Sequence, residues 1–261
     1  EALTALTEVA LAENVDFAVG VGDFTGSGQP WEFDIVFQGW QDLASRINIW
    51  AVPGNHDEKN MPGYVNAFVM PEGNEEQIED NLGEGWWAHR IGNVWMGGAW
   101  IRDFYFSMPD SDWGEVGWYR RQCEPNAVKT AQWKLFFIHQ PPYVTQWDDA
   151  CDWDGDDCLK VAMVPLMEEF GIHASFHGHM HGIEYGEVAP GVWELIAGGL
   201  GSGMDSGVCP IPEDFPDPWE TIYGIHNLAI VETGCDALTV RYLDLEGNEL
   251  ARIDIPAETG D

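Results

Sequence analysis

The sequence predicts an α/β fold in which two packed mixed β-sheets are flanked by helices. Apolar runs of strand length alternate with helix-like segments along the chain, which is the pattern of layered α/β proteins. The length of 261 residues suits one large domain, and no repeat or low-complexity linker divides the chain. No apolar run is long enough to cross a membrane. We therefore expect a single domain over residues 1–261.

The expected elements follow the periodicity of the apolar residues. The first twelve residues predict an amphipathic helix, because Leu3, Leu6 and Val9 recur at helical spacing. The last two apolar runs flank Gly234 and predict a hairpin. In chain order the sequence predicts a helix at 1–12, strands at 14–21, 47–52, 94–101 and 133–138, a helix at 161–170, and strands at 227–232 and 238–243.

Polar side chains follow four of the apolar runs in a fixed order. They are a Gly-Asp pair, a Gly-Asn-His-Asp turn, a lone histidine and a Gly-His-x-His turn. Carboxylate, amide and imidazole groups are hard and borderline ligands, which suit a two-metal hydrolytic centre. The candidate ligands are Asp23, Asn55, His139, His179 and His181.

This order of motifs resembles the calcineurin-like metallophosphoesterase family. Within it, residues 133–143 and the glycine-rich stretch 195–203 are similar to the purple and tartrate-resistant acid phosphatase group. The resemblance covers roughly the whole chain. It implies a calcineurin-like four-layer sandwich, in which two mixed sheets are packed together and helices flank them.

The resemblance also implies a role for each ligand. Asp23 matches the residue that bridges two metals, and His181 matches a ligand of the first metal. Asn55, His139 and His179 match the ligands of the second metal. The expected cofactors are two divalent transition metals, which could be Mn, Fe or Zn.

Three further residues beside these ligands have expected roles. The resemblance implies that His56 protonates the leaving oxygen as a general acid and that Asp57 holds its imidazole. His177 either fixes the tautomer of a metal ligand or is a plain buried residue.

Two departures from the family pattern change what we expect. The first motif, an aspartate at a strand end before the first helix, is absent, so the first metal lacks ligands within this chain. We expect that strand and motif upstream of Glu1; the alternative is a relative that never had them. Gly26 stands where the purple phosphatases have a tyrosine ligand, so their colour is not expected.

The expected function is hydrolysis of a small phosphate ester, with a phosphomonoesterase favoured. A phosphodiesterase of the same fold and a non-catalytic surface-assembly module are the alternatives. The specificity-determining rim is expected at residues 100–112, 146–158 and 205–219, which carry Trp147, Trp153 and Trp219. Arg102 is a candidate phosphate contact, with an ordinary surface role as the alternative. The oligomeric state is not encoded in any pattern that we recognise.

The formal net charge of −34 excludes whole classes of partner. Nucleic acids and anionic membranes bind basic patches, which this chain lacks. So large a charge destabilises a compact chain unless ions screen it. We therefore expect adaptation to salt, with an ordinary solvated acidic surface as the alternative.

The five cysteines suggest at least one disulfide. Cys151 and Cys158 bracket a short acidic loop that a disulfide could close, while the competing account is five reduced, buried thiols. Disulfides suit secreted proteins, so we expect an extracellular or periplasmic location. Residues 152–157 alternate aspartates as an EF-hand does, but the rest of that motif is missing. Calcium there is an alternative to a solvated loop.

Overall fold

The helices and strands of the protein come from a computed structural model that describes residues 1–69, 85–100, 114–147 and 150–257. The helical segments are α1 (Ala2–Ala12), α2 (Pro30–Ala44), η1 (Asp57–Asn60), α3 (Met61–Ala67), α4 (Gly114–Cys123), α5 (Asn126–Lys129), η4 (Leu159–Met163) and α6 (Val164–Phe170). The strands are β1 (Phe17–Gly20), β2 (Asn48–Ala51), β3 (Trp86–Ile91), β4 (Val94–Ala99), β5 (Trp133–Ile138), β6 (Ala174–His177), β7 (Ile183–Ala189), β8 (Val192–Ala197), β9 (Trp219–Ile222), β10 (Leu228–Thr233), β11 (Ala237–Leu243) and β12 (Glu249–Pro256).

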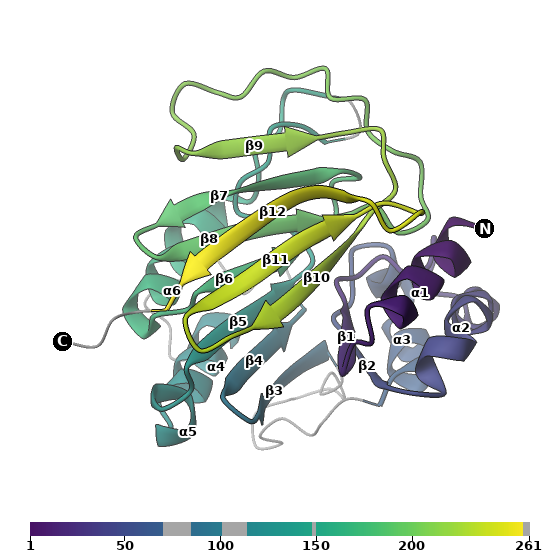
Figure 1. Ribbon diagram of the computed structural model, residues 1–261, viewed down its shortest axis with the longest axis horizontal. Coiled ribbons are helices and arrows are strands. Elements are labelled where there is room, and N and C mark those ends of the chain that lie inside the picture. Colours follow the sequence, from purple (N-terminus) through teal and green to yellow (C-terminus); the bar gives the residue numbers. More distant parts are fainter. Residues whose placement is uncertain (70–84, 101–113, 148–149, 258–261) are drawn as a thin grey trace.

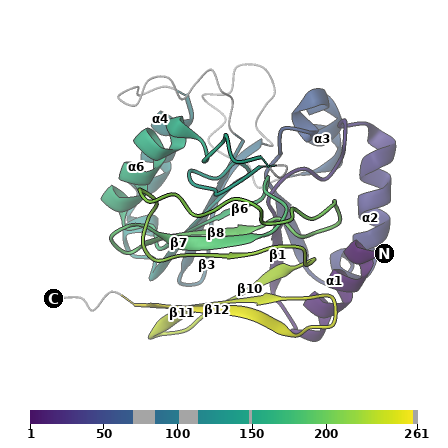
Figure 2. The same cartoon turned by 90° about the horizontal axis from the view of Figure 1, so that it is seen from above.

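A mixed seven-stranded sheet forms the centre of the molecule, with strand order β3-β4-β5-β6-β8-β7-β9. Strands β4, β5, β6 and β8 run parallel, and β3, β7 and β9 are antiparallel to their neighbours. Helices α4 and α6 cover one face, and strands β10–β12 lie against the other (Figures 1 and 2). The layered α/β fold expected from the sequence is confirmed.

The second sheet layer is divided rather than continuous. Strands β1 and β2 form a parallel pair, and β10, β11 and β12 form a separate antiparallel sheet. The predicted hairpin is present, since β10 and β11 pair on either side of Gly234. Helices α1, α2 and α3 lie beside β1 and β2 (Figure 1). The two parallel strands therefore lie at one side of the molecule. Their carboxyl ends point toward the carboxyl ends of the parallel strands in the central sheet.

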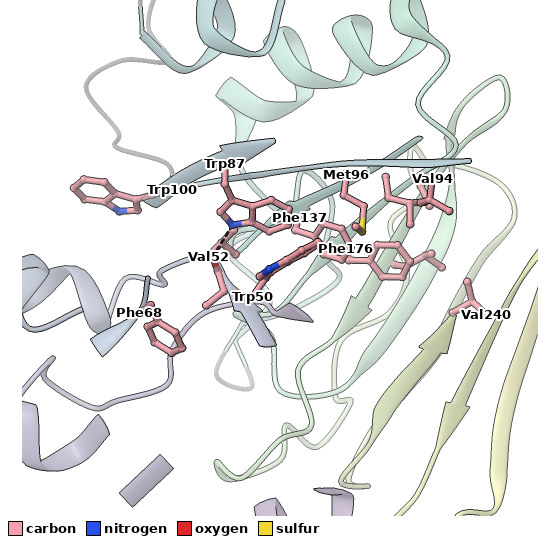
Figure 3. Close-up of a cluster of buried hydrophobic side chains, with 14 of the residues drawn as sticks. Trp50, Val52, Phe68, Trp87, Val94, Met96, Trp100, Phe137, Phe176 and Val240 are labelled. Carbon is pink, nitrogen blue, oxygen red and sulfur yellow. Dashed lines mark hydrogen bonds between the residues drawn. The ribbon is translucent and has the colours of Figure 1, made fainter. Parts of the chain in front are cut away.

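The core is packed mainly with aromatic residues. One apolar cluster joins α2, β2, the central sheet and β11–β12 (Figure 3). Trp87 is fully buried in it and donates its indole N–H to the carbonyl of Ala51 over 2.8 Å, which ties β3 to β2. A second cluster fills the space between the central sheet and helices α4 and α6. Burial on both faces explains why the parallel strands read as near-continuous apolar runs.

One predicted helix has a different form. The segment expected as a helix at 161–170 begins two residues earlier, with the π-helix η4, and continues as α6 to Phe170. Among the described residues, no helix has both the length and the apolar character needed to cross a membrane.

The disulfide predicted between Cys151 and Cys158 is wrong. Cys151 instead pairs with Cys209, which is 58 residues away in sequence, with 5.5 Å between the Cα atoms. Cys158 precedes η4, packs against the buried cluster under α4 and α6, and is not part of this bridge. The bridge therefore does not close the acidic loop. It ties the segment after β5 to the loop before β9.

Candidate metal centre

Each candidate ligand follows a parallel strand. Asp23 comes after β1, Asn55 after β2, His139 directly after β5, and His179 after β6. The carboxyl ends of parallel strands meet at one edge of a sheet, which is where α/β proteins bind ligands. The four side chains are thus brought together by topology from segments spread over more than half of the chain.

The donor atoms of these side chains converge on one point. The Asn55 Oδ1 atom lies 3.0 Å from His139 Nε2 and 2.9 Å from His179 Nδ1. The two imidazole nitrogens are 3.2 Å apart, and Asp23 Oδ2 lies 3.2 Å from His139 Nε2. We call Asp23, Asn55, His139 and His179 the donor cluster.

The chemistry of the donor cluster fits a transition metal. The Val21 carbonyl lies 2.7 Å from His139 Nδ1 and can only accept, so Nδ1 carries a hydrogen and Nε2 turns its lone pair into the cluster. Zinc bonds to N and O ligands measure about 2.0–2.2 Å, so ligands that subtend about 90–110° at one ion lie about 2.8–3.6 Å apart. The observed separations lie in that range. Within the described residues, Asp23, His139 and His179 are also a group of titratable side chains that could hold one ion.

The backbone is strained where it presents these ligands. Asp23 has φ of 55° and His179 has φ of 66°, in the left-handed region that non-glycine residues rarely adopt. Gly22 and Gly54 allow the close approach of the two turns. A Cβ on Gly54 would meet Asp23 Oδ1 at 2.2 Å, and one on Gly22 would meet His139 Nδ1 at 2.5 Å. Strain of this kind collects at functional sites.

The charges in the donor cluster are coupled. Burial alone would raise the pKa of the Asp23 carboxyl, but the hydrogen bond and charge of His139 lower it to about 2. Burial opposes protonation of His139, yet its contacts with Asp23 raise the imidazole pKa. Burial and the neighbouring His139 lower the pKa of His179 to about 3. His179 therefore stays neutral, which is the form that binds metals.

His181 lies outside this convergence. Its backbone N–H donates to Asp205 Oδ2 over 2.9 Å, and its ring is not part of the group of mutually close titratable donors among the described residues. Only Asp23, of the two ligands expected for the first metal, belongs to the donor cluster. The structure thus brings together the ligands expected for the second metal.

The environment of His56 differs from the expected one. Its ring Nδ1 lies 3.0 Å from the Gly26 carbonyl and 3.0 Å from Lys59 Nζ. Its backbone N–H donates to Asp23 Oδ1 over 2.8 Å. Lys59 was not anticipated from the sequence; its place three residues after His56, on one turn of η1, was the available signal. Because Nδ1 of His56 already makes these contacts, Nε2 is the ring nitrogen that can contact a substrate.

Asp57 does not hold the His56 imidazole. Its carboxylate is fully buried and accepts the backbone N–H groups of Phe24, Thr25 and Gly54 over 3.0–3.2 Å. Burial raises its pKa against these hydrogen bonds. Asp57 therefore ties the turn after β1 to the turn after β2, and so fixes Asp23 relative to Asn55. These backbone contacts of Asp57 take the place of the expected contact between Asp57 and the His56 imidazole.

His177 contacts no candidate ligand. Its Nδ1 donates to the Gln140 carbonyl at 3.0 Å, and its Nε2 lies 2.9 Å from the Ser175 hydroxyl oxygen. Burial lowers its pKa to about 3. Of the two roles considered for His177, the geometry matches the plain buried one, in which it supports the chain just after His139.

Two buried carboxylates hold the loop that follows His139. Glu184 accepts the N–H and hydroxyl of Thr145, the indole N–H of Trp219 and the hydroxyl of Tyr223. Glu194 accepts the N–H of Tyr143 over 3.0 Å. Burial raises the pKa of both carboxyls. We call Glu184 and Glu194 the carboxylate cluster.

The acidic loop forms ordinary loop contacts. Asp154 pairs with Lys160 at 3.0 Å, and Asp156 Oδ1 accepts the N–H of Leu159 at the start of η4. These aspartates do not converge on one point as metal ligands would. Residues 101–113, which include Arg102 and most of the first rim segment, lie outside the described residues.

Comparison with known proteins gives a consistent picture. Residues 1–182 match the family model for calcineurin-like phosphoesterases. No curated protein matches the chain. Among solved structures, a purple acid phosphatase from yellow lupin (Lupinus luteus) seeds has a TM-score of 0.70 at 13% identity, over 98% of this chain and 49% of that one. This chain thus spans about half the length of the lupin enzyme.

Two further structures share the fold over most of their own length. GAP50, described as the anchor in the inner membrane complex of Plasmodium, has a TM-score of 0.68 at 12% identity, over 99% of this chain and 84% of that one. A dimetal phosphatase from Danio rerio has a TM-score of 0.57 at 14% identity, over 98% and 88% of the two chains.

Proposed function

The chain belongs to the calcineurin-like phosphoesterase family, and on that premise we propose that it hydrolyses phosphate monoesters with the help of divalent transition metals. The convergence of Asn55 Oδ1, His139 Nε2 and His179 Nδ1 within 3.2 Å of one another is the observation that supports this most directly. Amide and imidazole atoms of this kind are ligands that suit a divalent transition metal.

Asn55, His139 and His179 would hold one metal, and Asp23 would bridge it to a second. Bound metals of this kind activate water and stabilise charge on the phosphoryl group. His56 would carry a proton on Nε2 and give it to the leaving oxygen. The Gly26 carbonyl orients that ring through Nδ1, and Asp57 holds the turns that place the ligands. Mn, Fe and Zn all remain candidate metals.

The metal on the other side of Asp23, which the sequence comparison calls the first metal, needs further ligands. Asp23 and His181 are the described residues proposed for it, and the His181 ring is not part of the group of mutually close titratable donors among the described residues. We propose that the remaining ligands come from outside the described residues. With both sets of ligands in place, the protein should bind two metals per chain; the donor cluster alone should bind about one.

A non-catalytic role is the second candidate, because only Asp23 and His181 among the described residues are proposed as ligands of the first metal. GAP50, which shares the fold, is described as an anchor. One experiment separates the candidates. The protein is reconstituted with Mn or Zn, its metal content is measured, and hydrolysis of p-nitrophenyl phosphate is compared with that of bis(p-nitrophenyl) phosphate.

A monoesterase should act mainly on p-nitrophenyl phosphate, whereas a diesterase should prefer the diester. Binding of two metals per chain without hydrolysis of either ester would contradict the enzyme proposal and favour the anchor role. Failure to bind any metal would contradict the donor cluster itself.

We also propose that the protein works outside the cytoplasm, which would allow the disulfide between Cys151 and Cys209 to persist. Mass spectrometry of the native, unreduced protein should find the peptides of these two cysteines linked. Finding both thiols free in protein isolated from its source would argue against an oxidising location.

A further inference from the structure

Two tryptophans enclose the metal-ligand candidate His179. The indole of Trp147 stacks on the His179 imidazole, with 5.4 Å between ring centroids and 8° between ring planes. Trp153 meets the same imidazole edge-on, with a centroid distance of 5.0 Å and an angle of 74°. The indoles also touch each other, 6.0 Å apart at 68°. These distances are those of favourable aromatic pairs.

The two tryptophans differ in what surrounds them. Trp153 packs against a buried apolar group of Val144, Met180 and Ile196. Trp147 is 44% exposed, although one of its faces lies against His179. Its indole is therefore partly open to solvent, one ring away from the donor cluster. Most of the described tryptophans are buried, and Trp31 is the other strongly exposed one.

The loop that carries Trp147 is held from several sides. Trp147 and Ala150 exchange backbone hydrogen bonds of 3.1 and 2.9 Å, and Cys151 follows at the disulfide to Cys209. Gln146 is fully buried, and its side-chain oxygen accepts the Cys209 N–H. Thr145 is bound by Glu184. Because these contacts already fix the Trp147 ring, a ligand that binds to it need not pay the conformational entropy of ordering it.

The geometry points to Trp147 as the binding surface for the organic part of the substrate, and it favours phosphate monoesters whose alcohol carries a planar aromatic ring. This inference rests on the proposed phosphoesterase function and specifies its substrate class. A phosphoryl group at the donor cluster lies beside His179, so the attached alcohol comes next to the ring stacked on that histidine. An aromatic ring there would bury the open face of Trp147 and gain stacking energy.

The charge of the same rim supports a substrate with few negative groups. Asp152 and Asp154 are exposed beside the tryptophans, and the whole chain carries a net charge of −34. The negative charges of this rim repel polyphosphates and other polyanions. A substrate with one phosphate and a neutral aromatic ring suits both the acidic rim and the exposed indole. Its phosphate would bind at the metal centre, and its ring would stack on Trp147.

The test compares the binding of two inert phosphonates that differ only in the organic group. Phenylphosphonate and methylphosphonate are titrated by calorimetry into the metal-loaded protein and into Trp147→Ala, Trp147→Leu and Trp147→Phe variants with verified metal content. The wild type should prefer phenylphosphonate. Trp147→Ala should lose about three- to tenfold of that preference, with methylphosphonate affinity unchanged.

The other variants separate aromatic stacking from bulk and folding. Trp147→Phe should keep most of the preference and Trp147→Leu should not, which decides the question even if the alanine variant fails to fold. Trp31→Ala is the matched control, since it removes an exposed indole that makes no ring contact with the site.

An unchanged preference in Trp147→Leu, or equal loss of both phosphonates together with metal, would overturn the inference and leave Trp147 as a support for His179. If the metal-loaded wild type bound neither phosphonate, the phosphoesterase proposal itself would fail, and the aromatic subsite with it. Binding of methylphosphonate without any phenyl preference would overturn the subsite alone.

Discussion

Two buried polar clusters lie on either side of the loop that follows β5, and they are satisfied in opposite ways. The carboxylate cluster is surrounded by protein donors: N–H and O–H groups from several segments point at Glu184 and Glu194. In the donor cluster the ligand atoms of Asn55, His139 and His179 lie within 3.2 Å of one another. A buried acceptor surrounded by protein donors stabilises the fold, whereas converging amide and imidazole ligand atoms suit a cation.

The comparison explains how the fold supports a metal centre. Glu184 and Glu194 anchor Tyr143 and Thr145, and His177 supports the Gln140 carbonyl, so the chain after His139 is held independently of any metal. Asp57 does the same for the turns that carry Asp23 and Asn55. The ligands can therefore stay in place while the ion comes and goes.

The largest effect should follow from removing a ligand of the donor cluster. His139→Ala should lower the metal content by about one ion per chain and reduce turnover on the order of 10³-fold or more, since loss of residues that merely support a ligand costs 10–100-fold. Elemental analysis and steady-state kinetics measure this. His226→Ala is the control, because the His226 ring hydrogen-bonds to the Gly199 carbonyl and is not one of the donor-cluster residues. Equal metal content in wild type and His139→Ala would contradict the assignment.

Removing the proposed proton donor should have a smaller effect that depends on the substrate. His56→Ala should reduce kcat/KM by about 10²–10⁴-fold on phenyl phosphate, whose leaving oxygen needs a proton, and far less on p-nitrophenyl phosphate. Both esters are aromatic, so stacking on Trp147 cancels from the comparison. Asp57→Asn should lower both rates alike, because Asp57 holds backbone N–H groups rather than the His56 ring. Equal losses in His56→Ala would make His56 a positional residue.

Substituting a residue of the carboxylate cluster should change the stability of the protein rather than its metal content. Glu184→Ala leaves the Trp219 N–H, the Tyr223 hydroxyl and Thr145 without their acceptor, so it should lower the free energy of unfolding by about 2–4 kcal/mol. Denaturant unfolding of the metal-free protein measures this. Glu220→Ala, on an exposed position of β9, should stay within about 0.5 kcal/mol of wild type. A Glu184→Ala protein as stable as the control would remove the contrast between the clusters.

The candidate ligands of the donor cluster could be selected from the sequence because they share a simple rule. Asp23, Asn55, His139 and His179 all follow apolar runs, and parallel strands bring their carboxyl ends together whatever the distance along the chain. The layered fold followed from the alternation of the same runs. His181 follows the same strand two residues later, and its backbone N–H is held by Asp205.

Contacts between loops could not be predicted in this way. Cys151 pairs with Cys209 rather than with Cys158, since nearness in sequence does not decide which thiols meet in space. The carboxylate of Asp57 and the ring of Trp147 each point at partners more than 30 residues away. No periodicity encodes those directions. They depend on tertiary packing, as does the π-helical start of the helix before Phe170.

The smallest and most general effect should come from a change in salt concentration. Salt screens the charges of surface carboxylates but not those of buried ones. The chain has 45 acidic against 11 basic residues, and raising monovalent salt from 0.1 M to 1 M shortens the Debye length from about 10 Å to about 3 Å. The melting temperature should therefore rise over this range. Glu184→Gln should melt lower but rise with the same slope, because Glu184 is fully buried and is not screened. A melting temperature that stays flat or falls would show that the acidic surface is no adaptation to salt, and a slope altered by Glu184→Gln would mean that the carboxylate cluster is reached by solvent ions.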